Sequence, residues 1–317
     1  PCLNEEKPLP AVLGELPRHI DGIDTIETLI IDDGSTDNTI AVAQAHGVDH
    51  IIRHPRNQGL ARAFRSGLEA CLKLGADIIV NTDGDNQYPA ATIAQLVTPV
   101  IHKQADIVIG DRQVATISHF STTKKLFHAL GTAVVRSVSG TDIADAVSGF
   151  RAYSREAALR LTILTQFSYT LDTIIQAGKL GMTIRSVPVN TNDPTRPSRL
   201  QRNMWHFIKA QAATILRLYA FYEPLRTFSY IAAPFFLLGF FLLGRFSYFY
   251  LTTGADRFEQ SVSIGIGLVI VGFLIFLVGV QADIIARHRM LTQETLYRLK
   301  KFELDNTAEN STDTHPL

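Results

Sequence analysis

Two long apolar runs near the C-terminus constrain the fold of this chain most. Residues 228–250 (FSYIAAPFFLLGFFLLGRFSYFY) and 262–281 (VSIGIGLVIVGFLIFLVGVQ) are each long enough to cross a bilayer as a helix, which takes about 20 apolar residues. Neither run has the polar face of a helix that packs on a soluble core. We therefore predict a hairpin of two transmembrane helices rather than two buried core helices. Such a hairpin could also pair copies of the chain into a homo-oligomer.

The charges around this hairpin predict its orientation. The connection, residues 251–261, carries one basic residue, Arg257, whereas basic residues gather on both outer sides of the hairpin. Because cytoplasmic loops carry an excess of Lys and Arg, we expect a multi-pass protein of the cell membrane with both ends and the N-terminal domain in the cytoplasm. The flanking basic residues are Arg196, Arg199, Arg202, Lys209, Arg217 and Arg226 before the hairpin, and Arg287, Arg289, Arg298, Lys300 and Lys301 after it.

Length and composition limit the number of domains and the partners. The chain has 317 residues and a formal net charge of +0 at pH 7. This length suits one large domain with an appendage, and the neutral charge does not favour nucleic acid as a partner. Cys2 and Cys71 are the two cysteines, so no disulfide framework is expected. The sequence opens at PCLNEE without a Met, and we expect the first strand of the domain to be missing.

The first 200 residues alternate between strand and helix patterns. This alternation predicts an α/β domain with a mostly parallel sheet. The expected strands lie within residues 25–35, 49–54, 76–80, 105–110 and 183–189. The expected helices lie within residues 37–47 and 59–75. The apolar face of the second helix should consist of Leu60, Phe64, Leu68 and Leu72.

Two acidic turns follow strands of this predicted sheet. DDGSTD begins at Asp32, and DGDNQYP begins at Asp83, two residues before Asp85. Ligands of open α/β sheets bind at the carboxyl ends of the strands. Two carboxylates this close repel each other unless they share a cation or have unequal pKa values. The two turns therefore favour a metal-dependent site for a sugar nucleotide over an ordinary solvated turn.

Other classes of site do not fit these motifs. An EF-hand loop that begins at Asp83 requires Gly at its sixth position and Glu at its twelfth, where this chain has Tyr88 and Ala94. No G-x-G-x-x-G sequence follows an early strand, and no Walker A sequence is present. Because an acidic turn repels a bare phosphate, a nucleotide diphosphate would have to bind here through Mg²⁺ or Mn²⁺.

Six sequence blocks resemble, in the right order, glycosyltransferase family 2 with the GT-A fold. Within this family the chain is similar to the polyprenyl-phosphate (dolichyl- or undecaprenyl-phosphate) hexose synthases, over about residues 1–227. The resemblance implies transfer of a hexose from a nucleotide sugar of the GDP-mannose or UDP-glucose type to a polyprenyl phosphate, with inversion. The blocks are PCLNEE (1–6), IDDGSTDNT (31–39), DGDNQYP (83–89, matching the metal motif D-x-D-x-Q-x-P), GDR (110–112), DAVSGFRAYSRE (145–156) and TRPSRL (195–200).

The resemblance also implies roles for individual residues. Asp33 would accept a hydrogen bond from the base or ribose, and Asp32 would hold the turn. The metal ligands would be Asp83, Asp85 and Gln87. The donor-binding residues would be Pro1, Leu3, Glu5, Asp32, Asp33, Asp83, Gly84, Asp85, Gln87 and Arg112. The residues that bind the acceptor or a phosphate would be Arg112, Arg196, Ser198 and Arg199. The catalytic residues would be Asp85, Asp172 and Arg196.

The expected acceptor decides whether a catalytic base is needed. A hydroxyl acceptor must lose a proton, whereas a phosphate ester is already an anion at neutral pH. Many family 2 enzymes with hydroxyl acceptors carry Glu-Asp late in the domain, but this chain has Leu171 before Asp172. We therefore expect an orienting or structural role for Asp172, with general-base catalysis as the alternative.

Three rival functions are disfavoured. Processive polysaccharide synthases carry Q-x-x-R-W, whereas QRNMW (201–205) has Met204 in place of the arginine. A family 2 enzyme that uses a hydroxyl acceptor in cell-wall or polysaccharide synthesis is a second rival. A catalytically inactive membrane scaffold is a third, and the intact DGDNQ argues against it.

The predicted order of segments follows from these patterns. Residues 204–226 mix aromatic and basic side chains, as helices in the membrane interface do, although a helix packed on the catalytic domain has the same pattern. The polar tail that begins at Phe302 is expected to be disordered. The four segments are a glycosyltransferase domain (1–200), an amphipathic interfacial region (201–227), the hairpin (228–282), and a basic segment with its tail (283–317).

Overall fold

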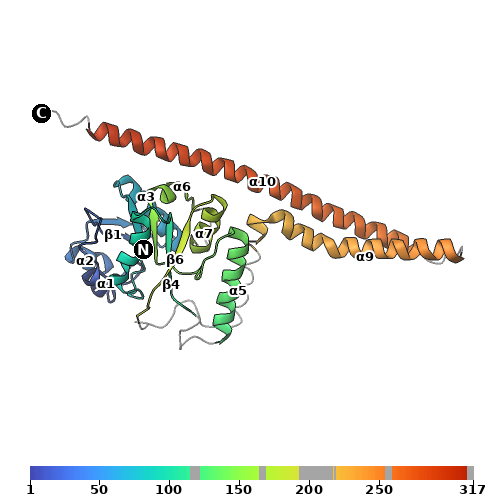
Figure 1. Ribbon diagram of the computed structural model, residues 1–317, viewed down its shortest axis with the longest axis horizontal. Coiled ribbons are helices and arrows are strands. Elements are labelled where there is room, and N and C mark those ends of the chain that lie inside the picture. The colour runs from blue at the N-terminus through green and yellow to red at the C-terminus, as the bar shows by residue number, and fades with distance from the viewer. Residues whose placement is uncertain (115–121, 164–168, 193–216, 218, 254–258, 313–317) are drawn as a thin grey trace. The chain divides into compact units, whose positions relative to one another are not determined.

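The computed structural model describes residues 1–317 except 115–121, 164–168, 193–216, 218, 254–258 and 313–317 (Figure 1). The chain forms two compact units. The first unit comprises Pro1–Gln211 together with Leu296–Leu317, and the second comprises Ala212–Thr295. The predicted interfacial stretch, 204–226, lies largely outside the described residues.

The first unit is an α/β domain, as predicted, and each expected strand is present. Its elements in chain order are α1 (Leu9–Glu15), β1 (Leu29–Asp32), α2 (Thr39–Ala45), β2 (His50–Arg53), α3 (Leu60–Lys73), β3 (Ile78–Asn81), the 3-10 helix η1 (Ala90–Thr92), α4 (Ile93–Ile101), β4 (Ile107–Asp111), α5 (Thr122–Ser139), β5 (Arg151–Ser154), α6 (Arg155–Arg160), α7 (Tyr169–Lys179) and β6 (Ile184–Pro188).

The strands pair in a mixed rather than a mostly parallel arrangement. β1 and β2 are parallel, and a second set of strands has the order β3-β5-β4-β6. β5 is antiparallel to both β3 and β4, whereas β4 and β6 are parallel. β5 was not expected as a strand, because the four residues RAYS lie inside the block DAVSGFRAYSRE and have no apolar run of their own.

The antiparallel direction of β5 has a consequence for the site. Arg151 begins β5 and lies opposite Asn81, the last residue of β3. Since β5 runs in the reverse direction, the loop that precedes it, residues 145–150, lies at the edge where β3 and β4 end. This brings DAVSGF next to the turns that follow those two strands.

Helix α3 covers part of this sheet with three of the four predicted apolar residues. Phe64, Leu68 and Leu72 are buried, and the ring of Phe64 stacks on Tyr169 of α7 with centroids 4.2 Å apart. Leu60 is 53% exposed, so its assignment to the core face is wrong. It is the first residue of α3 and follows Gly59, which places it at the end of the helix rather than over the sheet.

The N-terminal residues extend the parallel pairing of β1. The amide of Cys2 donates to the carbonyl of Ile31 at 2.7 Å, and the amide of Asp33 donates to the carbonyl of Cys2 at 2.9 Å. These two hydrogen bonds place Pro1–Glu5 beside the carboxyl end of β1, where the acidic turn begins.

The second unit contains the helices that match the apolar runs. α9 spans Pro224–Thr253, and α10 spans Glu259–Thr312, of which the part up to Thr295 belongs to this unit. Both are long and apolar enough to cross a membrane, and only 17% of the apolar window of each is buried. This exposure argues against two buried core helices.

Small residues allow α9 and α10 to pack closely within the second unit. A Cβ atom added to Gly239 would lie 2.9 Å from the carbonyl oxygen of Gly265, and one added to Gly279 would lie 2.7 Å from Cβ of Phe228. Glycine at such points lets helix backbones approach each other in an apolar environment. The two helices therefore form the predicted hairpin.

The last helix, α10, extends beyond the second apolar run into the polar C-terminal segment. α10 is a single helix of 54 residues that continues to Thr312 (Figure 1). The tail predicted from Phe302 onward therefore begins within α10. From Leu296 onward the chain belongs to the first unit.

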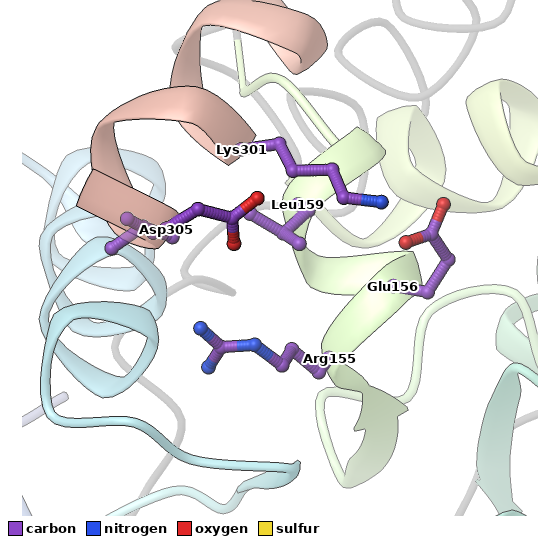
Figure 2. Close-up of a pocket in the computed structure, with 6 residues that line it drawn as sticks. Arg155, Glu156, Leu159, Lys301 and Asp305 are labelled. Atoms are coloured by element: carbon purple, nitrogen blue, oxygen red, sulfur yellow. The ribbon is translucent and has the colours of Figure 1, made fainter. Parts of the chain in front are cut away.

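Contacts with α6 hold this part of α10 in the first unit. The hydroxyl of Tyr297 donates to Glu156 at 2.9 Å, and the guanidinium of Arg160 lies 4.3 Å from the centre of the Tyr297 ring. Lys301 and Asp305 line a cavity of about 250 Å³ together with residues of α6. Figure 2 shows these two side chains on α10, facing Arg155, Glu156 and Leu159 of α6. A hydrogen bond and a cation–π contact thus join α10 to α6.

We expect replacement of Tyr297 by Ala to destabilise the first unit by about 1–2 kcal/mol, because it removes a hydrogen bond to a charged group and a partly exposed cation–π contact. Tyr297→Phe should lose only the hydrogen-bond part. Thermal unfolding in detergent measures both effects. Leu299→Ala is the matched control, since Leu299 lies on the same turn and is 54% exposed. Equal melting temperatures for Tyr297→Ala and Leu299→Ala would contradict this role for Tyr297.

Candidate functional site

The DGD turn packs against the N-terminal residues. A Cβ atom added to Gly84 would lie 2.8 Å from Sγ of Cys2 and 3.6 Å from Cγ of Glu5. A side chain at position 84 would therefore push these two turns apart. Pro1 and Glu5, predicted to bind the donor, thus lie beside the predicted metal motif, and Leu3 stands between them in the same segment.

The turn after β1 is held by hydrogen bonds from the N-terminal segment. The amide of Asn4 donates to Oγ of Ser35 at 2.9 Å, and the amide of Thr36 donates to Oδ1 of Asn4 at 2.8 Å. Within the turn, Oδ1 of the fully buried Asp32 accepts the amide of Ser35 at 3.2 Å. A side chain that caps its own turn in this way has the geometry of a structural residue.

Asp33 is occupied by contacts that the sequence did not reveal. Its Oδ1 lies 2.7 Å from Nδ1 of His54 and accepts the amide of Gln58 at 2.9 Å, while its Oδ2 accepts the amide of Gly59 at 2.8 Å. His54 in turn lies 3.0 Å from Oγ of Ser66. Asp33 therefore fastens the loop between β2 and α3 to β1. A carboxylate has about four lone-pair sites, and these contacts occupy three of them.

Gly34 makes this fastening possible. Its φ angle is +80°, and a Cβ atom there would lie 2.5 Å from the carbonyl carbon of Arg56. Glycine is required both for the backbone angle and for the close approach of the loop. The NQG sequence at 57–59, directly after β2, is the signal that could have identified this loop as part of the site.

The two carboxylates of the DGD turn repel each other, and a bound cation would reduce this repulsion. Burial and the nearby carboxylate of Asp85 raise the pKa of Asp83, and the charge of Arg112 opposes that shift. Asp85 also accepts the amide of Gln87 at 3.1 Å, which places Gln87 in the same turn. A divalent ion would relieve the cost of holding two acids together, and their oxygens are the ligands that Mg²⁺ and Mn²⁺ prefer.

The described side chains offer only part of a coordination shell for a metal ion. Within the described residues, no group of three or more His, Cys, Asp or Glu side chains could hold an ion by itself. Asp83 and Asp85 therefore fit a cation that takes its other ligands from Gln87, water or a bound diphosphate.

Arg112 lies at the end of β4 in a cluster with two residues that the sequence did not single out. Its Nε donates to Oδ2 of Asp145 at 2.6 Å, and its Nη2 donates to Oδ1 at 3.0 Å. Nε2 of His128, on α5, lies 2.9 Å from the same Oδ1. Asp145 is fully buried. The acidic residue at the start of the block DAVSGF is the sequence feature that could have identified Asp145 as a partner of Arg112.

The predicted catalytic Asp172 lies on α7 and is 1% exposed. The same helix is bound by the fully buried Arg151, which donates to the carbonyl of Thr170 and to Oγ1 of Thr173, both at 2.8 Å. A base must reach the proton that it removes. The burial of Asp172 supports an orienting or structural role. Arg196, Ser198, Arg199 and the block 201–205 lie outside the described residues.

Comparison with known proteins identifies the family of this chain. Residues 1–162 match the model of glycosyl transferase family 2. An undecaprenyl-phosphate mannosyltransferase of Micrococcus luteus is 27% identical over 199 residues, which cover 60% of this chain and 80% of that protein. A UDP-N-acetylglucosamine–dolichyl-phosphate N-acetylglucosaminyltransferase of Methanococcus voltae is 28% identical over 215 residues, which cover 60% and 83%.

Solved structures show the same fold. Glucosyl-3-phosphoglycerate synthase of Mycobacterium tuberculosis, in complex with phosphoglyceric acid, has a TM-score of 0.53 and 23% identity over 69% of this chain and 77% of that one. The same synthase in complex with Mn²⁺, uridine diphosphate and glucosyl-3-phosphoglycerate has a TM-score of 0.52 with the same identity and coverage. Together with the family match over half of its length, this shows that the chain is a glycosyltransferase that belongs to glycosyl transferase family 2.

Proposed function

We propose that this protein transfers a hexose from a nucleotide-diphosphate sugar, of the GDP-mannose or UDP-glucose type, to a polyprenyl phosphate in the membrane, with inversion. The observation that carries the proposal is the DGD turn, in which Gly84 packs against Cys2 and Glu5 and Asp83 lies against Gly149. The same chain has two candidate membrane helices. The relatives named for undecaprenyl-phosphate and dolichyl-phosphate transferases support a lipid phosphate as the acceptor.

The donor would bind between the two acidic turns. Asp83, Asp85 and Gln87 would hold Mg²⁺ or Mn²⁺, which when bound neutralises the diphosphate and stabilises it as a leaving group. Pro1–Glu5 and the turn at Asp32–Asp33 would line the nucleoside. Arg112 offers a planar fork that suits phosphate oxygens.

The acceptor would attack without a general base. A polyprenyl phosphate is an anion at neutral pH, so the protein has to orient it and overcome its repulsion from the acids and the diphosphate. Arginine side chains can do both, and we assign these two roles to Arg112, Arg196 and Arg199. Asp172 would then help to position α7 rather than remove a proton.

Labelled sugar nucleotides test the proposal directly. Membranes that contain the protein would be incubated with Mn²⁺ and, in turn, GDP-mannose, UDP-glucose and UDP-N-acetylglucosamine, each with undecaprenyl phosphate. We expect one donor to give a glycolipid that mild acid cleaves, as a sugar–phosphate bond should be. Transfer to free polyprenol alone would identify a hydroxyl acceptor, and absence of product with every donor would contradict the proposal.

The proposed location is the cell membrane, with both ends and the active site in the cytoplasm. A cysteine introduced at Thr253 should react with a membrane-impermeant maleimide in intact cells, because residues 252–261 would lie on the outer side. Lys73→Cys, on the exposed side of α3, is the control that should react only after the cells are opened. The reverse pattern would overturn the orientation.

A further inference from the structure

We infer that Asp145 is a positioning residue that aims the guanidinium of Arg112 at a phosphate group bound beside Asp83. The inference rests on the proposed function, because it takes a phosphate as the ligand at this edge of the sheet. It assigns a role to a residue that neither contacts the donor turns nor carries a ligand itself.

The geometry of the Asp145–Arg112 pair fixes the plane of the guanidinium. Two parallel hydrogen bonds, of 2.6 Å from Nε and 3.0 Å from Nη2, join the two side chains. The side chain of Asp145 is fully buried and that of Arg112 is 13% exposed, so solvent hardly competes for this contact. A bidentate pair sets orientation as well as distance.

The pair leaves the rest of Arg112 available for a ligand. A guanidinium has five N–H donors, of which Asp145 takes two. The remaining donors lie on Nη1 and on the second hydrogen of Nη2, along the edge that faces away from Asp145. An edge with parallel N–H groups suits two oxygens of one phosphate.

Asp145 is itself held by three further donors. Its Oδ1 lies 2.9 Å from Nε2 of His128 and accepts the amides of Val147 and Ser148, each at 3.1 Å. Burial would raise its pKa, but the hydrogen bonds from His128 and Arg112 outweigh this and lower it, so the carboxylate stays ionised. Asp145 thus ties the end of β4 to α5 and to the loop before β5.

This restraint also protects the metal motif. The loop that begins at Asp145 lies against Asp83, since a Cβ atom added to Gly149 would lie 3.3 Å from Oδ2 of Asp83. The pair of Asp145 and Arg112 is therefore anchored beside the metal motif. Without Asp145, the guanidinium could turn and pair with Asp83 or Asp85, which would take ligands away from a cation. With Asp145 present, Arg112 adds positive charge at the site while its guanidinium stays paired with Asp145.

A double-mutant cycle separates positioning from a merely structural role. We expect Asp145→Asn to lower kcat/KM about 10²-fold, as small misplacements of positioning groups do. Arg112→Ala should cost at least as much, and the double variant should be no worse than Arg112→Ala, because Asp145 acts through Arg112. Asp142→Asn is the matched control, since Asp142 also pairs with an arginine, Arg136, but is 93% exposed. A further loss from Asp145→Asn in the Arg112→Ala background would overturn the inference.

Binding measurements identify which phosphate Arg112 meets and do not require turnover. Calorimetric titrations would use uridine diphosphate and guanosine diphosphate with Mn²⁺, and farnesyl phosphate as the lipid-phosphate probe. Weaker binding of the nucleotide assigns Arg112 to the donor, and weaker binding of farnesyl phosphate assigns it to the acceptor. Unchanged binding of every probe in folded Asp145→Asn would contradict the inference.

A second variant and the binding titrations cover the cases in which Asp145→Asn does not fold or the protein transfers no sugar. If Asp145→Asn fails to fold, Arg112→Lys tests the same point, because it keeps the charge and the backbone contacts of Asp145 but lacks the planar fork. We expect it to weaken phosphate binding at least tenfold, and normal binding would overturn the inference. If the unmodified protein transfers no sugar, the proposed function fails, while the titrations still decide the role of Asp145.

Discussion

Replacement of Asp85 by Ala should abolish transfer, with a loss of about 10³-fold or more in kcat/KM. The change removes an oxygen ligand from the cation that would neutralise the diphosphate, a contribution of several kcal/mol to the transition state, and each 1.36 kcal/mol is about tenfold in rate. Binding of the nucleoside diphosphate should weaken in Mn²⁺. When excess chelator removes the Mn²⁺, the variant and the unmodified protein should bind the nucleoside diphosphate equally weakly. Calorimetry in both conditions measures this difference.

Asp77→Ala is the matched control for this experiment. Asp77 lies just before β3, at the opposite end of the strand that leads into the DGD turn, and its side chain is exposed. The variant should retain full activity. Near-normal transfer by Asp85→Ala would show that DGD is an ordinary turn rather than a metal site. The proposed function would then lose its main support.

Asp172→Asn should retain substantial transfer to polyprenyl phosphate. A phosphate nucleophile has no proton to lose, and Asn has nearly the shape of the Asp that it replaces. Loss of a true general base, in contrast, typically costs 10²–10⁴-fold, roughly 3–5 kcal/mol. Variants of Arg196 and Arg199 should lose more activity than Asp172→Asn, because they would hold phosphate against charge repulsion.

The measurement compares polyprenyl phosphate with free polyprenol as acceptors, for each variant. Thermal unfolding is needed beside it, since Asp172 is 1% exposed and its replacement can disturb packing. The phosphate hypothesis is wrong if polyprenol is the better acceptor, or if folded Asp172→Asn is as inactive as Asp85→Ala. Either result would restore Asp172 as a base and favour a hydroxyl acceptor in polysaccharide synthesis.

The features that the sequence determined by itself are those encoded by neighbouring residues. The hairpin follows from two long apolar runs, each of which matches the length needed to cross a bilayer. The strands before Asp32 and Asp83 follow from short apolar runs, and the acidic turns follow directly after them. Because ligands of α/β sheets bind at the carboxyl ends of strands, these two turns could be proposed as the candidate site without coordinates.

The sequence did not reveal the partners of these site residues. Asp33 contacts His54, and Arg112 contacts Asp145, across separations of 21 and 33 residues. No local pattern encodes such a contact, because it depends on the path of the chain between the two residues. The result is that Asp33, expected to face a ligand, is largely occupied by its own chain.

The direction of β5 and the end of α10 were likewise decided by the tertiary structure. RAYS has no strand pattern of its own, and it becomes a strand because β3 and β4 offer hydrogen bonds on both of its sides. Because β5 is antiparallel to β3 and β4, the loop before it, which contains Asp145, lies at the edge where those two strands end. The polar residues after Phe302 were expected to be disordered because they bury little apolar surface. In the structure these residues continue α10 as far as Thr312. Extension of a helix that has already formed adds one hydrogen bond per residue, so polar residues can follow an apolar segment in the same helix. The contact between Tyr297 and Glu156 joins this part of α10 to α6.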